Sequence, residues 1–303
     1  MRKILLTGAY SCTSKEIDKL CALGCKIDFI QQEADVITTP EAYDAVICNN
    51  LFAYHDIRMF SNLEYIQLTS AGYDRVPMHY INEKGIIIKN ARGVYSIPIA
   101  EHVVMFALEL MRNGKFFYEN QKNRIWKKCR NLIELHNKTA VIIGCGSIGM
   151  EIAKRFCAFN VKNIGIDTCP IASAFLTECR DISQLYNVVQ QADIVVSAIP
   201  YTEETHHIFD SSFFQHMNEN AIFINVSRGG LVDEEALVAA LKTRRIRGAA
   251  LDVFENEPLS IDDDIWDVEN LIITPHNSFV GDGNSQRLFD VIYGNLQEWM
   301  SLQ

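Results

Sequence analysis

Short apolar runs alternate with mixed polar and apolar segments in the first part of the chain. Most of these runs end in Gly, Asn, Thr or Ser, which are typical of the turns that follow strands. Strands that alternate with helical segments indicate a parallel sheet with helices on both faces. We therefore predict an α/β domain whose strands are Lys3–Thr7, Lys26–Ile30, Asp44–Cys48, Tyr65–Thr69 and Ile86–Lys89.

A second series of the same kind begins near Thr139. Its helical segments include Gly149–Phe159 and Asp233–Thr243, and the latter starts with an N-cap aspartate and an acidic first turn. Six strands with intervening helices match the size of one dinucleotide-binding domain. The predicted strands are Thr139–Ile143, Val161–Ile166, Asp193–Ile199, Ala221–Val226, Gly248–Val253 and Leu271–Thr274.

Two further helices are predicted outside these series. Ser96–Arg112 is apolar on nearly all sides, which is typical of a helix buried on several faces. We expect it to join the two domains and to pack against a partner subunit; burial within one domain is the alternative. Asp290–Leu302 is amphipathic and no strand follows Thr274, so we expect this helix to return to the first domain and make it discontinuous.

Composition narrows the class of protein. A length of 303 residues suits two domains, and a net charge of -10 argues against a nucleic-acid partner. The nine cysteines show no zinc-ligand spacing, so we predict reduced thiols and no metal site. The adjacent His206 and His207 are interpreted as solvated. The apolar runs are too short for a signal peptide or a membrane span, so we expect a cytoplasmic protein without membrane contact.

A glycine-rich motif follows the strand Thr139–Ile143. In Gly144-Cys-Gly146-Ser147-Ile148-Gly149, the first glycine permits a tight turn and the second permits close approach of a pyrophosphate. The third glycine lets the next helix pack on the strand, and the N-terminus of that helix attracts the phosphate charge. The motif predicts a dinucleotide site.

Asp167 follows the next strand, at about the spacing of the acid that binds the adenosine ribose hydroxyls. Its charge would repel a 2′-phosphate, and Thr168 and Cys169 offer no basic group to bind one. We therefore predict NAD rather than NADP as the cofactor. The alternative is that the glycines are ordinary turns and that Asp167 caps a helix.

Three charged or titratable residues follow the last three predicted strands. Arg228 follows the fourth strand, Glu257 the fifth and His276 the sixth. The carboxyl ends of parallel strands line the ligand crevice of such sheets, so we expect these side chains to converge there. As alternatives, Arg228 could pair with the acidic segment Asp233–Glu235, and Glu257 and His276 could be ordinary turn residues.

The three residue types suit the reduction of a 2-oxo acid. A guanidinium group pairs with a carboxylate through two hydrogen bonds and polarises a neighbouring carbonyl. An imidazole exchanges a proton with the C2 oxygen near neutral pH. A neighbouring carboxylate orients the imidazole and stabilises its charged form.

These stretches together resemble the D-isomer-specific 2-hydroxyacid dehydrogenases, the phosphoglycerate dehydrogenase-like family. The resemblance covers nearly the whole chain and implies two doubly wound parallel-sheet domains. A Rossmann-type NAD-binding domain, residues 95–280, is expected to be inserted in a discontinuous flavodoxin-like substrate domain, residues 1–94 and 281–303. It also implies a homodimer. The matching stretches are Thr69–Asp74, Ala100–His102, Thr139–Gly149, Ala198–Thr205, Asn225–Gly229, Ala250–Pro258 and Trp266–His276.

The resemblance implies a role for each residue that matches a family motif. His276 resembles the acid/base, Glu257 its carboxylate partner and Arg228 the substrate-binding arginine. Asp252 is expected beside the nicotinamide carboxamide, and Pro200 beside the adenosine half of NAD. In the family, the loop that corresponds to Ser70, Ala71 and Gly72 holds the substrate carboxylate through its N–H groups.

One departure from the family bears on the substrate. In the phosphoglycerate dehydrogenase branch, arginines after the third strand help to hold the phosphate, whereas here Asn49–Tyr54 has no basic residue. Arg58 or Arg75 could replace them. We expect instead that Leu51, Phe52 and Tyr54 favour an apolar or small uncharged group.

The predicted reaction interconverts a 2-oxo acid and its D-2-hydroxy acid. The alternatives are an NAD(H)-sensing protein that resembles the family's corepressors, and a phosphite or formate dehydrogenase on the same fold.

Overall fold

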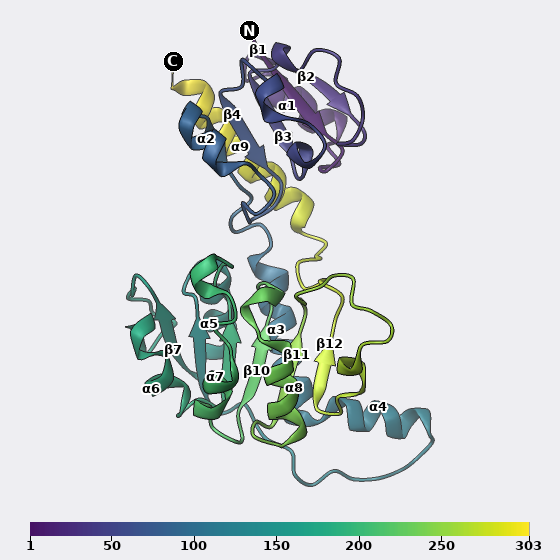
Figure 1. Ribbon diagram of the computed structural model, residues 1–303, viewed down its shortest axis with the longest axis vertical. Helices are drawn as coiled ribbons and strands as arrows, with labels where there is room; N and C mark the ends of the chain where they lie inside the picture. The colour runs from purple at the N-terminus through teal and green to yellow at the C-terminus, as the bar shows by residue number, and fades with distance from the viewer. Residues whose placement is uncertain (303) are drawn as a thin grey trace. The chain divides into compact units, whose positions relative to one another are not determined.

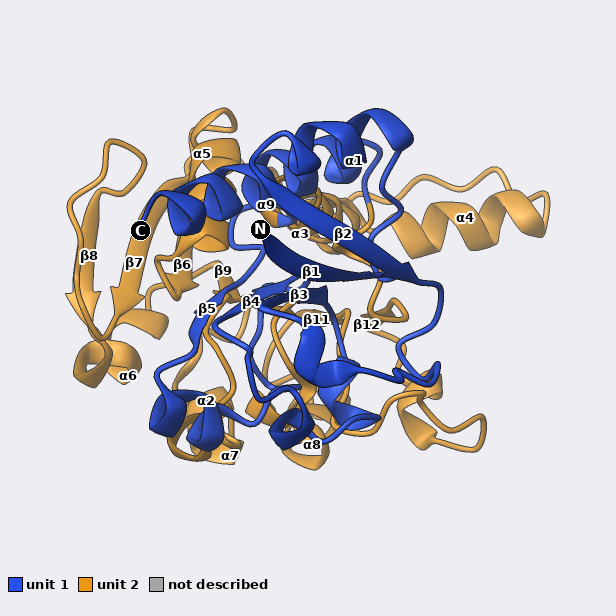
Figure 2. Ribbon diagram, turned by 90° about the horizontal axis from the view of Figure 1, so that it is seen from above, with its two compact units in different colours: residues 1–95, 281–303 blue, residues 96–280 orange. Residues whose placement is uncertain are grey.

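The computed structural model describes residues 1–302. The chain divides into two compact units, Met1–Tyr95 with the residues from Gly281 onward, and Ser96–Val280 (Figures 1 and 2). Both units are built on parallel sheets, and the first is discontinuous in sequence, which confirms the predicted fold class. All the predicted strands are present, with their ends shifted by one or two residues at most.

Unit 1 is a five-stranded sheet with the strand order β2-β1-β3-β4-β5, in which every pair is parallel. Successive β1 residues face opposite sides of the sheet, so Ile4 and Leu6 enter one apolar core and Leu5 the other. The elements of this unit are β1 (Arg2–Thr7), α1 (Ser14–Cys21), β2 (Cys25–Ile30), β3 (Ala45–Cys48), β4 (Tyr65–Leu68), α2 (Met78–Lys84), β5 (Ile87–Lys89) and α9 (Asn284–Ser301).

The C-terminal helix α9 closes one of these cores. Its apolar residues, among them Ile292 and Trp299, pack with β1 and β4, and the Trp299 ring stacks on Tyr65 at 4.8 Å. The expected return of this segment to the first domain is confirmed. The helix begins at Asn284 rather than Asp290. Its first four residues are polar, but the buried Leu288 and Phe289 already belong to its apolar side, so the predicted start was too late.

Unit 2 is a seven-stranded parallel sheet with the strand order β12-β11-β10-β9-β6-β7-β8. The prediction of six strands was wrong, since Glu178–Asp181 forms an edge strand beside β7. This strand is polar and only partly buried, so no apolar run marks it. The sheet consists of β6 (Thr139–Ile143), β7 (Lys162–Asp167), β8 (Glu178–Asp181), β9 (Ile194–Ser197), β10 (Ile222–Asn225), β11 (Gly248–Leu251) and β12 (Leu271–Ile273).

Six helices accompany this sheet: α3 (Ser96–Arg112), α4 (Gly114–Lys122), α5 (Ser147–Cys157), α6 (Leu185–Val189), α7 (Ser211–His216) and α8 (Glu234–Lys242). Helix α3 has the predicted bounds and belongs wholly to this unit, where it packs against α5, β10 and β11. Within the described residues, no helix is long and apolar enough to span a membrane.

Candidate active site

The predicted site residues of unit 2 follow strands that end at one edge of its sheet. The parallel register of β6, β9, β10, β11 and β12 brings their carboxyl ends together. The glycine motif follows β6, Pro200 follows β9, Arg228 follows β10, Asp252 follows β11 and His276 follows β12. This edge therefore collects groups that lie far apart in the sequence.

The three motif glycines meet different surroundings. Gly144 has a φ of +98°, and a Cβ there would lie 2.4 Å from the Ala198 carbonyl oxygen. A Cβ on Gly149 would lie 2.0 Å from the Gly144 carbonyl oxygen. A Cβ on Gly146 would have no heavy atom within 4 Å, so this position borders open space. Helix α5 starts directly afterwards at Ser147, and Gly146 provides no side chain to cap its first N–H groups.

Asp167 is the last residue of β7, and its carboxylate binds the glycine loop. Oδ2 accepts the Cys145 N–H at 2.7 Å, and Oδ1 accepts the Cys169 N–H at 3.0 Å. The segment between Asp167 and β8 is not helical, so the alternative that Asp167 caps a helix is wrong. The Cys145 side chain is buried under the loop, and burial raises the pKa of its thiol.

His276 and Glu257 form a hydrogen-bonded pair. His276 Nδ1 lies 2.7 Å from Glu257 Oε2, while Glu257 Oε1 accepts the Phe254 N–H at 3.0 Å. Both oxygens of the carboxylate are thereby oriented. If Nδ1 carries the proton that it donates to Glu257, Nε2 retains the lone pair with which it can accept a proton.

The backbone of His276 lies in the left-handed region, with a φ of 51°. This conformation costs about 1–2 kcal/mol for a residue with a side chain, and such residues gather at functional sites. The His276 N–H donates to the Asp252 carbonyl oxygen at 2.7 Å and so fixes the imidazole to the end of β11.

The fully buried Asp252 side chain organises the segment that carries His276. Its carboxylate accepts hydrogen bonds from Thr274 Oγ1 at 2.5 Å, the Asn277 N–H at 2.8 Å and the Ser278 N–H at 2.9 Å. His102 Nε2 in α3 lies 3.3 Å from Thr274 Oγ1. Sequence reasoning missed Thr274 and His102, although both lie in stretches that resemble the family.

Arg228 lies half-buried at the end of the loop after β10. Its Nη1 donates to the Ser227 carbonyl oxygen at 2.8 Å, and its own carbonyl oxygen accepts from Asn225 Nδ2 at 2.9 Å. The acidic start of α8 was the alternative partner suggested for Arg228. Two of its carboxylates accept hydrogen bonds from backbone groups. Asp233 accepts the Ala236 N–H, and Glu234 accepts the Glu255 N–H.

Ser70, Ala71 and Gly72 belong to unit 1, where they follow β4. The carbonyl oxygens of this loop are engaged within the unit. Asn90 Nδ2 donates to the Ala71 oxygen at 2.6 Å, and Ser70 Oγ donates to the Gly72 oxygen at 3.2 Å. These contacts hold the backbone of the loop in a defined conformation.

The segment after β3, whose apolar side chains were expected to favour an uncharged substrate group, is only partly accessible. Leu51 is 1% exposed and belongs to the core of unit 1, so it is unavailable to a ligand. Phe52 is partly buried, and Tyr54 is exposed. A carboxylate lies here: Glu33 accepts the N–H groups of Asn49 and Asn50, both at 2.6 Å.

His207 also differs from its interpretation as a solvated residue. Its Nε2 atom is buried and lies 3.4 Å from Glu255 Oε1.

Comparisons with known proteins point to one family. Residues 104–278 match the family model of the D-isomer specific 2-hydroxyacid dehydrogenase, NAD binding domain. The chain is 36% identical to D-3-phosphoglycerate dehydrogenase of Methanocaldococcus jannaschii over 73% of its length, but spans only 42% of that relative. It is 32% identical to glyoxylate/hydroxypyruvate reductase A of Arabidopsis thaliana over 84% of this chain and 82% of the relative.

A solved structure shows the same similarity. The D-isomer specific 2-hydroxyacid dehydrogenase family protein from Aeromonas salmonicida superposes with a TM-score of 0.78 and 30% identity, over 94% of this chain and 92% of that one. The two-unit fold, the glycine motif after β6 and these matches lead to one conclusion: the chain belongs to the D-isomer specific 2-hydroxyacid dehydrogenase family.

Proposed function

We propose that this protein is an NAD-dependent oxidoreductase that interconverts a small 2-oxo acid and its D-2-hydroxy acid. The observation that carries the proposal is the hydrogen bond of 2.7 Å between His276 and Glu257. This oriented acid/base pair follows strands that end at the same sheet edge as the glycine motif. Proximity of a proton donor to a nicotinamide site is what carbonyl reduction requires.

The glycine loop fits a dinucleotide. The open space at Gly146 leaves room for a pyrophosphate, and the uncapped N-terminus of α5 offers N–H groups to its charge. We assign Asp167 to the adenosine ribose and Pro200 to the adenosine half of the cofactor. Asp252 was expected beside the nicotinamide carboxamide, but its side chain is fully buried. We therefore propose that its hydrogen-bond network holds the segment that carries His276 in place at this site. When bound, NAD supplies or accepts the hydride.

In the proposed mechanism, the protein supplies orientation, charge and a proton. The guanidinium of Arg228 pairs with the substrate carboxylate and polarises the C2 carbonyl. The N–H groups of Ser70, Ala71 and Gly72 in unit 1 are assigned to a substrate carboxylate, as the resemblance to the family implies. His276 donates a proton to the C2 oxygen during reduction, and Glu257 stabilises the imidazolium form that does so.

We further propose that the substrate carries no phosphate. The N–H groups of Asn49 and Asn50 are bound by the Glu33 carboxylate, which would repel a phosphate at this place. Arg58 forms an ion pair with Asp56, which already satisfies part of its guanidinium. These contacts favour substrates such as glyoxylate, hydroxypyruvate or pyruvate over phosphohydroxypyruvate.

NADH oxidation with a panel of 2-oxo acids tests the proposal. We expect turnover of one or more unphosphorylated acids, with NADH preferred over NADPH in parallel reactions. Equal use of NADPH would refute the role of Asp167 as cofactor selector, and a preference for phosphohydroxypyruvate would refute the substrate class. NADH binding without turnover of any acid would instead favour a cofactor-sensing protein.

We also propose that the protein is a cytoplasmic homodimer. The nine cysteines of the chain are all free thiols, as is typical of a reducing compartment. The dimer is supported by the apolar side chains exposed on and after α4, such as Tyr118 and Trp126.

A further inference from the structure

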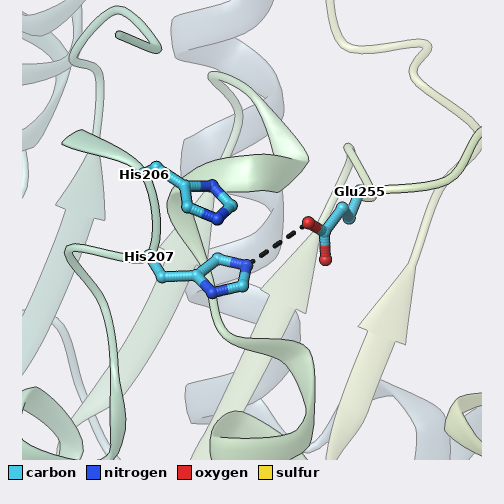
Figure 3. A group of neighbouring side chains, drawn as sticks. All are labelled: His206, His207 and Glu255. Atoms are coloured by element: carbon cyan, nitrogen blue, oxygen red, sulfur yellow. Dashed lines mark ion pairs between the residues drawn. The ribbon is translucent and has the colours of Figure 1, made fainter. Parts of the chain in front are cut away.

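Two histidines and a glutamate from different parts of unit 2 converge beside the loop after β11. His206 and His207 follow the short helical turn Glu203–Thr205, and Glu255 lies on the loop that also carries Glu257. One ligand-type atom of each of His206, His207 and Glu255 lies within 4.8 Å of the others. Figure 3 shows both imidazole rings and the carboxylate facing a common space.

The backbone holds the two histidines in place. The His207 N–H donates to the Gly230 carbonyl oxygen at 2.9 Å, and Phe209 pairs with Leu231 and Val232 in a short parallel bridge. His207 has a φ of 51° and, like His276, adopts the left-handed conformation that is rare for residues with side chains. The rings of His206 and His207 stack with centroids 3.8 Å apart.

The orientation of the rings leaves nitrogen lone pairs available. His206 Nδ1 lies 3.2 Å from the Gly230 carbonyl oxygen and 3.3 Å from the Tyr201 hydroxyl. When Nδ1 donates to the carbonyl oxygen, Nε2 has the lone pair. A backbone carbonyl that binds the second ring nitrogen is the usual support of a metal-binding histidine. His207 Nε2 is buried and has no hydrogen-bond partner of good geometry.

The spacing suits a metal ion. His207 Nε2 and Glu255 Oε1 are 3.4 Å apart. Two ligands of one tetrahedral zinc ion, each about 2.0 Å from the metal, lie about 3.3 Å from each other. His206, whose ligand atom lies within 4.8 Å of the other two, would be the third ligand, and water can occupy a fourth position.

The local charge also favours a cation. Glu234 accepts the Glu255 N–H at 2.8 Å, so a second carboxylate lies beside the cluster. A bound cation would offset the repulsion among these carboxylates.

We propose that His206, His207 and Glu255 bind a divalent transition metal ion of the Zn²⁺ class. Neither adjacent histidines nor the distant glutamate has the spacing of a known zinc motif, which explains why the sequence did not indicate this site. The ion would restrain the loop from Glu255 to Glu257. The proposal does not depend on the proposed hydride chemistry, because metal binding is measured directly.

Cobalt binding to the full-length protein tests this site. Co²⁺ is titrated into the metal-free protein, and the visible d–d bands report its coordination. We expect one Co²⁺ per chain, bound without the near-ultraviolet charge-transfer band of a thiolate ligand. His207→Ala and Glu255→Gln should each weaken binding at least about tenfold. The exposed His216 provides the matched control, and His216→Ala should bind as the wild type does.

Thermal unfolding in the presence of a chelator shows whether each variant is folded. If His207→Ala does not fold, the near-isosteric Glu255→Gln still tests the site. Three outcomes would overturn the proposal. These are the absence of binding at millimolar Co²⁺, a thiolate band that accounts for the bound cobalt, and equal affinity in the wild type and both folded variants.

Discussion

His276 is the residue on which the proposed reaction depends most directly. Replacement of His276 by Ala removes the proton donor but leaves the glycine loop and Asp167 unchanged. We expect turnover to fall about 10²–10⁴-fold while the affinity for NADH stays near that of the wild type. Steady-state assays and NADH fluorescence titration measure the two quantities. His136→Ala, at an exposed position of the same unit, is the control. Near-normal turnover of His276→Ala would exclude the acid/base role.

Alanine substitutions at Gly146 and Gly149 are expected to affect different properties, cofactor binding at the first position and folding stability at the second. A Cβ on Gly146 meets open space, so we expect Gly146→Ala to fold normally but to bind NADH about 10–100-fold more weakly, because the methyl group occupies the room of the pyrophosphate. A Cβ on Gly149 meets the Gly144 carbonyl oxygen at 2.0 Å, so Gly149→Ala should lower the free energy of unfolding by about 1–3 kcal/mol.

Calorimetry and thermal unfolding of both glycine variants check this contrast. The glycine variants serve as controls for each other, since the same methyl group is added at both positions. Unchanged NADH affinity in Gly146→Ala would mean that the pyrophosphate does not approach this backbone.

At the scale of elements, helix α9 is attached to unit 1 through Trp299. The ring is 3% exposed, stacks on Tyr65 and lies 3.7 Å from the Arg2 guanidinium carbon. Trp299→Ala should therefore destabilise unit 1 by about 3–5 kcal/mol. Urea unfolding followed by circular dichroism measures the change. Gln297→Ala, on the exposed side of the same helix, should stay within about 0.5 kcal/mol of the wild type. Equal stability of the two variants would show that α9 does not depend on this contact.

His102 in helix α3 makes the stability of the folded protein depend on pH. Burial lowers the pKa of this imidazole, and the charge of Asp252 opposes that shift only in part. The folded state therefore holds His102 neutral where the unfolded chain binds a proton. This part of the stability is complete above the unfolded pKa of about 6.5 and is lost as the pH falls toward the folded value.

His102→Gln should accordingly lose less stability than the wild type between about pH 8 and pH 5. Melting temperatures of the variant and the wild type are compared across this pH range. The pH dependence that comes from carboxylates is shared by both proteins, so the difference between them reports on His102. Parallel pH profiles would contradict the assignment.

At the scale of the whole molecule, the apolar surface of α4 and the following segment predicts self-association. No residue of α4 is buried, Phe117 and Tyr118 are exposed on it, and Trp126 is 100% exposed. Figure 1 shows this helix extending away from the sheet of its own unit. We expect a dimer in light scattering and a monomer for the double variant Phe117→Glu with Trp126→Glu. Met59→Glu, at another exposed apolar position, should remain dimeric. A monomeric wild type would refute the proposed homodimer.

The sequence by itself determined nearly all strands of this protein, several of its helices and most of its candidate chemical groups. Periodic apolar runs identified every strand except Glu178–Asp181, because an edge strand buries too little surface to require an apolar pattern. The glycine motif was recognisable because a tight strand-to-helix turn limits which residues can occur there, and Asp167 was recognisable by its place at the end of the next strand.

Only the tertiary structure decided which of these groups meet. The contacts of His276 with Glu257, and of Thr274 with Asp252, depend on the order and register of strands that are distant in the sequence. The burial of Leu51 and the convergence of His206 and His207 with Glu255 have the same origin. Local patterns report what each segment prefers, whereas proximity between segments arises only when the whole chain packs.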